Sequence, residues 1–116
     1  MSKPEWYKAI EHFLAMARDN YGAQFRDLYQ IAGLEYGGAE DQADIDLVVV
    51  LAPGDWQQIA ERRRLAGLAF DVMHDEGVLI RARPVSEDAW NNPISGIEGA
   101  EIAELKARAR AITVPA

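Results

Sequence analysis

The stretch IAGLEYGGAEDQADIDLVVVL, residues 31–51, is the most informative part of the chain. It reads as the end of one strand, a turn that contains glycines, and a second, strongly apolar strand. In a strand, residues i and i+2 project to the same face, about 6–7 Å apart along the backbone. Asp44 and Asp46 are therefore expected on one face of the second strand. The opposite face is predicted to carry Ile45, Leu47, Val49 and Leu51.

The two aspartates are candidate metal ligands. Two ionised carboxylates side by side repel each other unless solvent, a cation or a basic group neutralises them. Hard divalent cations prefer oxygen ligands, so Asp44 and Asp46 predict a site for Mg²⁺ or Mn²⁺. The alternative is that both are solvated residues at the start of a strand on the edge of a sheet.

The same segment resembles the active-site segment of the DNA polymerase β-type nucleotidyltransferases in their minimal, stand-alone bacterial form. In that family a Gly-Ser pair ends one strand, and Asp-x-Asp opens the next after a mostly polar segment. Gly33 matches the glycine, and Asp44 and Asp46 match the two acids. Leu34 stands where the family has serine. The resemblance covers most of residues 25–100, because residues 77–90 also look like the third strand and the segment that follows it.

The resemblance implies a fold and an activity. The fold would be α+β, a short mixed sheet of three or more strands with helices packed on one side, and residues 1–116 would form a single nucleotidyltransferase-like domain. The activity would transfer a nucleoside monophosphate from a metal-bound nucleoside triphosphate, with ATP expected, to an unknown acceptor. Asp44 and Asp46 would be the catalytic metal ligands, and Gly33 would let the backbone approach the phosphates. Several members of this size act as antitoxins of toxin–antitoxin pairs, so a helical protein partner is expected.

Two departures from the family pattern bear on activity. Leu34 has no hydroxyl group with which to contact a phosphate. The family also places a further carboxylate on the third strand, where this chain has Leu79 or Arg81. Both departures weaken the prediction of nucleotidyl transfer.

Arg81 and Arg83 allow two interpretations. Arg81 could pair with an aspartate in place of a metal, leaving a folded but inactive site. Alternatively, Arg81 and Arg83 could hold phosphate, because the guanidinium fork suits it. With Gly33 and Leu34, they are then the candidate nucleotide-binding residues. Three hypotheses follow: a nucleotidyltransferase, a catalytically inactive relative that binds a protein partner, and an unrelated α+β binding domain.

Composition restricts the partners. The chain has 116 residues, 49% of them apolar, which is enough for one domain with its own core. Its net charge of −7 makes nucleic acid an unlikely main partner. It has no cysteine, no signal-peptide pattern at its N-terminus and no apolar run of membrane-spanning length, so a cytoplasmic protein that does not enter membranes is expected.

The remaining elements follow from periodicity and from turn residues. The long crossover between the second and third strands suits a parallel pair, although an antiparallel pair is also compatible with it. Residues 61–64, Glu-Arg-Arg-Arg, are interpreted as a solvated helix face. The sequence predicts helices over 4–20, 56–74 and 99–111, strands over 25–32, 45–51 and 78–83, and a short helical turn capped by Ser86.

Overall fold

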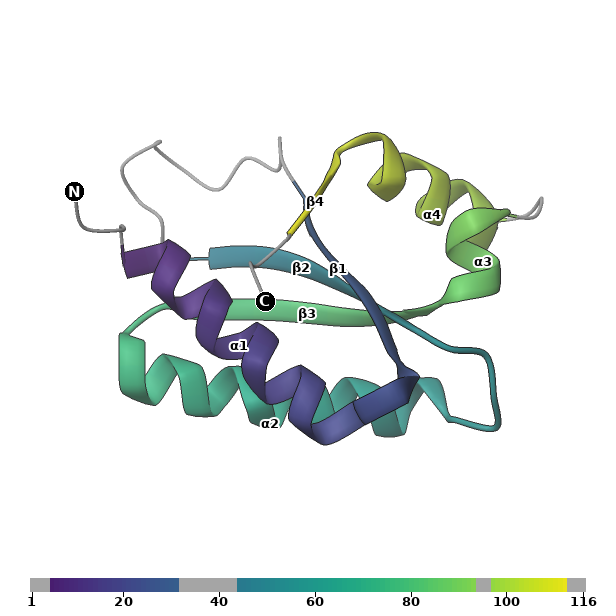
Figure 1. Cartoon of the computed structure of the whole chain (residues 1–116). Coiled ribbons are helices and arrows are strands. Elements are labelled where there is room, and N and C mark those ends of the chain that lie inside the picture. Colours follow the sequence, from purple (N-terminus) through teal and green to yellow (C-terminus); the bar gives the residue numbers. More distant parts are fainter. Residues whose placement is uncertain (1–4, 32–43, 94–96, 113–116) are drawn as a thin grey trace.

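The computed structural model describes residues 5–31, 44–93 and 97–112 (Figure 1). In chain order, its elements are α1 (Glu5–Tyr21), the 3-10 turn η1 (Gly22–Gln24), β1 (Phe25–Ile31), β2 (Asp44–Leu51), α2 (Gln58–Glu76), β3 (Leu79–Ser86), α3 (Glu87–Asn91), α4 (Ile97–Ala107) and β4 (Ala109–Ala111).

The strands form one mixed sheet in the order β3-β2-β1-β4. β2 runs parallel to β3, and β1 pairs antiparallel with both β2 and β4. The connection through α2 is therefore a βαβ crossover, which decides between the two pairings that the sequence left open. The expected α+β fold with a short mixed sheet is confirmed.

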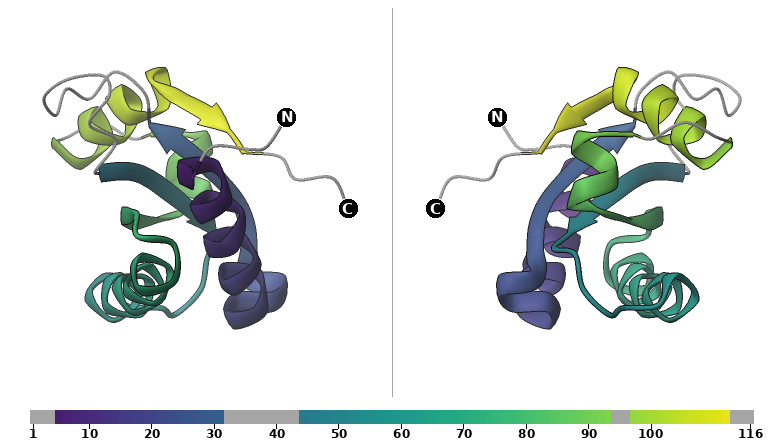
Figure 2. Two further views of the ribbon diagram at one scale, coloured as in Figure 1. Left: turned by 90° about the vertical axis from the view of Figure 1, so that its left-hand side faces the viewer. Right: turned by 90° about the vertical axis from the view of Figure 1, so that its right-hand side faces the viewer.

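Helices lie on both faces of this sheet, so the expectation of helices packed on one side was wrong. The long helices α1 and α2 lie together on one face, and the short helices α3 and α4 lie on the other (Figure 2). The two covers follow the alternation of β2, because neighbouring side chains point to opposite faces. Ile45, Leu47, Val49 and Leu51 belong to the large core with α1 and α2, whereas Val48 and Val50 join a smaller core with Trp90 of α3.

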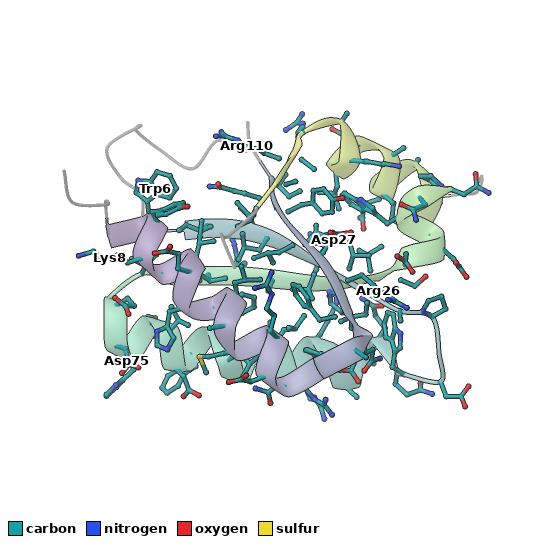
Figure 3. All side chains as sticks on the ribbon, in the orientation of Figure 1. Trp6, Lys8, Arg26, Asp27, Asp75 and Arg110 are labelled. Atoms are coloured by element: carbon teal, nitrogen blue, oxygen red, sulfur yellow. The ribbon has the colours of Figure 1, made fainter. Side chains whose placement is uncertain are left out.

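The two long helices run antiparallel and are joined by polar contacts. The Tyr21 hydroxyl donates a hydrogen bond to Glu61 Oε1 at 2.8 Å, and His12 Nδ1 lies 3.2 Å from Glu76 Oε2. Figure 3 shows the start of α1, marked by Trp6, and the end of α2, marked by Asp75, at the same end of the molecule. Glu61 is buried, so its interpretation as part of a solvated face was wrong.

Two predicted boundaries shift because of pairing within the sheet. β3 continues through Pro84 to Ser86 because it is an edge strand, where proline's missing N–H costs no ladder bond. The Pro84 carbonyl accepts a hydrogen bond from Gln58 Nε2 of α2 at 3.1 Å. The last helix ends at Ala107 rather than residue 111, and Ala109–Ala111 pair with the free edge of β1 instead.

The short helix α3 begins where the sequence predicted it. Ser86 is its N-cap, and the Ser86 hydroxyl accepts a hydrogen bond from the Ala89 amide at 3.3 Å. Within the described ranges, none of the helices is both long and apolar enough to cross a membrane.

Candidate functional site around Asp46 and Arg81

Asp46 lies on the face of the sheet that α1 and α2 do not cover. Its neighbours Ile45 and Leu47 are buried in the large core, so alternation directs the Asp46 side chain to the opposite face. A shift of the strand by one residue would bury this carboxylate under the helices and expose the apolar row. The apolar packing of β2 therefore fixes the orientation of Asp46, as the sequence predicted.

The parallel pairing of β2 with β3 brings Arg81 beside Asp46. The two residues are partners in the ladder. Arg81 Nε lies 3.3 Å from Asp46 Oδ1, and Arg81 Nη2 donates to Asp46 Oδ2 at 3.4 Å. The guanidinium group thus contacts both carboxylate oxygens, the two-point geometry in which arginine binds a carboxylate. The Asp46 side chain is 17% exposed and that of Arg81 45%, so solvent still reaches the pair.

The other expected site residues are placed only in part. Asp44 is the first residue of β2, and its backbone pairs with Leu79 of β3. The Asp44 side chain, Gly33 and Leu34 lie outside the described residues. Leu79 is exposed, and it occupies the ladder position opposite Asp44. Neither ladder partner of the two aspartates therefore carries a carboxylate.

The described residues do not fit a centre of two metal ions. Among them, no group of three or more His, Cys, Asp or Glu side chains could hold a metal ion. Two-metal sites need several carboxylates around the reacting phosphate. Asp46 instead has the positive charge of Arg81 against both of its oxygens.

A shallow pocket of about 260 Å³ opens beside this pair, and two further arginines, Arg62 and Arg83, line it. Arg83 Nη1 donates to Glu101 Oε1 at 3.2 Å, which links the middle of β3 to α4. Arg62 comes from α2 and is exposed. The pocket is lined by Ile31, Asp46, Leu47, Arg62, Arg81, Ala82, Arg83 and Leu105.

A second pocket, of about 280 Å³, adjoins the first. The two share Arg62, Arg83 and Leu105 in their walls. Together they form one groove that follows β3 between α2 and α4. Its basic side chains make it a candidate site for an anionic group such as phosphate.

The positions of Arg62 in the pocket and of Glu61 in the core were not predicted from the sequence. In a parallel crossover, the first turns of the helix lie near the end of the following strand, so Arg62 could have been placed near Arg83 once β2 and β3 were known to be parallel. Glu61 shares its helix face with Leu65, Leu68 and Val72, all buried, at the spacing of an apolar face. That spacing was a usable signal for its burial.

Comparisons with known proteins add no assignment. Neither the protein-family models, nor the curated proteins, nor the solved structures that were searched contain a match to this chain. The resemblance to nucleotidyltransferases therefore stays a prediction that rests on Gly33, Asp44, Asp46 and the segment around β3.

Proposed function

We propose that this chain is a nucleotidyltransferase-like protein that does not transfer nucleotides and acts by binding a protein partner. The observation that carries the proposal is the contact of the Arg81 guanidinium with both oxygens of Asp46. In the nucleotidyltransferases that the sequence resembles, the equivalent carboxylate holds a metal ion. Here the chain supplies its own cation at that carboxylate.

Electrostatics support a site that works without a metal. A divalent ion bound to Asp46 would stand within a few ångströms of the Arg81 positive charge, and like charges at that distance repel each other strongly. Leu79, opposite Asp44 in the ladder, offers no oxygen ligand to compensate. A metal would have to displace Arg81 from Asp46, and the ladder partners of the two aspartates would add no carboxylate in exchange.

The expected partner is a helical protein. This expectation comes from the family resemblance, because several family members of this size work beside helical partners. The chain's net charge of −7 also favours a protein over nucleic acid, because binding to a phosphate backbone needs positive charge.

A second candidate function is binding of a nucleoside triphosphate, with ATP expected. The arginine-lined groove beside Asp46 favours it, because guanidinium groups bind phosphate through paired N–H donors. Arg62, Arg81 and Arg83 would hold the phosphates. This candidate differs from the first in requiring a small-molecule ligand.

Calorimetric titration separates the two candidates. ATP, GTP, CTP and UTP are titrated into the wild type, Asp46→Asn and Arg62→Ala, each with and without Mg²⁺. The proposal predicts no Mg²⁺-dependent binding in any of the three proteins. Mg²⁺-dependent binding that Asp46→Asn abolishes would refute it and establish a metal–nucleotide site. Binding that needs no Mg²⁺ but is lost in Arg62→Ala would favour the second candidate.

A further inference from the structure

The two halves of the groove along β3 differ in the side chains that line them. The half beside Asp46 contains Arg62, Arg81 and Arg83. The other half has apolar walls that come from the segment before α2 and from β3, α3 and α4: Trp56, Pro84, Val85, Ala89 and Ile102. Leu105 lines both halves, so the apolar wall continues to the arginines. A ligand that fills the groove would therefore need an apolar body and an anionic end.

The uncharged polar side chains of the apolar half already have partners within the chain. Trp56 Nε1 and Gln58 Nε2 donate hydrogen bonds to backbone carbonyls at 2.9 and 3.1 Å. The Ser86 hydroxyl accepts a hydrogen bond from the Ala89 amide at 3.3 Å. Because these groups are engaged in the fold, this half of the groove offers a ligand mainly apolar contacts.

The charged side chains that line the groove leave one positive charge in excess. Arg81 contacts Asp46. Arg83 Nη1 donates to Glu101 Oε1 at 3.2 Å. Within the described ranges, Arg62 has no ion-pair or hydrogen-bond partner. Three arginines and two carboxylates thus line the groove, and this balance suits a ligand with a single negative charge. A nucleoside triphosphate carries several negative charges, of which the groove would compensate only a part.

We propose that the groove binds a small carboxylic acid with an apolar body. The carboxylate pairs with Arg62, because a guanidinium group can contact both carboxylate oxygens. The apolar body lies along Leu105 and Ile102 in the second pocket, where its burial favours binding. Joined, the two pockets reach the size of small-molecule sites, about 300–1,000 Å³.

This ligand class goes beyond both functions proposed above. It does not depend on a protein partner, because every residue that lines the groove belongs to this chain. It also differs from a nucleoside triphosphate in charge and in its apolar body. α2 lies below the sheet and α4 above it in Figure 1, so the ligand would contact both helices at the edge formed by β3.

NMR titration of the ¹⁵N-labelled full chain tests the ligand class. Hexanoate is the probe, hexanol supplies the apolar chain without the charge, and inorganic phosphate supplies the charge without the apolar chain. Hexanoate should shift the backbone amides of Ala82, Ala89 and Leu105 saturably at millimolar concentration. Hexanol and phosphate should each bind at least about tenfold more weakly, because each lacks one of the two contacts.

Arg62→Ala and Arg63→Ala test the anchoring charge as a matched pair. Both side chains are exposed on α2, but of the two only Arg62 lines the groove. Arg62→Ala should raise the dissociation constant of hexanoate about fivefold or more, whereas Arg63→Ala should leave it unchanged. The dispersion of the amide resonances establishes that each variant is folded.

Four results would overturn the proposal. They are the absence of saturable shifts with hexanoate, hexanol binding as tight as that of hexanoate, an equal loss in Arg62→Ala and Arg63→Ala, and tighter binding of phosphate than of hexanoate. The last result would favour the second candidate function, because it would show that the arginines bind phosphate without help from the apolar wall.

Discussion

Two polar pairs lie on opposite sides of the same sheet and differ in their surroundings. Tyr21 and Glu61 meet between α1 and α2, where Glu61 is buried and its carboxylate accepts a hydrogen bond at 2.8 Å. Asp46 and Arg81 meet on the other face, where water reaches both side chains. A buried polar group depends on its partner, because without that partner its desolvation is uncompensated. An exposed ion pair contributes little to stability.

This difference in burial indicates that Tyr21 and Glu61 serve the fold, whereas Asp46 and Arg81 belong to the candidate site. The Tyr21–Glu61 contact joins the two long helices, and Arg64 completes it, with Nε 3.8 Å from Glu61 Oε1 and the guanidinium carbon 5.3 Å from the Tyr21 ring centroid. The Asp46–Arg81 pair adds little to the core, so its geometry is better explained by the site than by stability. Removing the Tyr21–Glu61 contact should weaken the fold. Removing Arg81 from the second pair should instead change what binds at Asp46.

The largest effect should come from the strand that separates the two faces. Leu47→Ala removes a buried side chain from the large core and should lower the free energy of unfolding by about 3 kcal/mol. Val48→Ala, its neighbour on the smaller core, removes fewer methyl groups and should cost about 2 kcal/mol. Urea denaturation of both variants measures the difference. A cost of less than about 1 kcal/mol for Leu47→Ala would contradict its burial in the large core.

Tyr21→Phe should have the next largest effect. It leaves the buried Glu61 carboxylate without its hydrogen-bond donor and should cost about 2 kcal/mol. Tyr29→Phe is the matched control, because Tyr29 contacts Trp90 through its ring, with centroids 4.9 Å apart, and should change stability by less than about 0.5 kcal/mol. Urea denaturation of the two variants side by side measures how much the buried hydrogen bond contributes to stability. Equal costs for the two variants would contradict the prediction.

The same tyrosine predicts a pH dependence. Burial, together with the hydrogen bond to Glu61 and its nearby charge, raises the pKa of Tyr21 above its ordinary value. The folded protein therefore holds this proton more tightly than the unfolded chain. The resulting stability is complete below about pH 10 and declines as the pH rises further. Denaturation from about pH 8 to 11 should show a decline that is smaller in Tyr21→Phe than in the wild type.

The smallest effect on stability should come from the exposed pair. A double-mutant cycle with Asp46→Asn and Arg81→Gln should give a coupling energy of about 0.5 kcal/mol that falls as salt is added. Denaturation at low and high ionic strength measures it. A coupling above about 2 kcal/mol would mean that this pair, like the first, serves the fold.

Local patterns in the sequence predicted the central strand β2, the face on which Asp46 lies, and the cap of α3. Alternation along residues 45–51 placed Asp46 opposite the buried row, and Ser86 was recognised as a helix cap. These features depend on residues close together in the chain, so periodicity and capping rules reach them.

Features that depend on distant partners were missed. β4 forms because the free edge of β1 accepts Ala109–Ala111, and helical periodicity alone gave no sign of that edge. The hydrogen bond of Glu61 depends on Tyr21, forty residues earlier in the chain. Arg62 reaches the pocket beside Asp46 only because α2 is part of a parallel crossover. In each case tertiary pairing decides the outcome, and a local pattern contains no information about it.

The most direct test of the central claim asks whether Arg81 excludes a metal from Asp46. Mn²⁺ is added to ¹⁵N-labelled wild type and to Arg81→Ala, and paramagnetic broadening of the backbone amides is followed by NMR. If Arg81 holds the cation position, saturable broadening around Asp46 is absent in the wild type and increases in Arg81→Ala, where the carboxylate is released. Saturable broadening centred on Asp46 in the wild type would contradict the account, because it would show that a metal binds despite the ion pair.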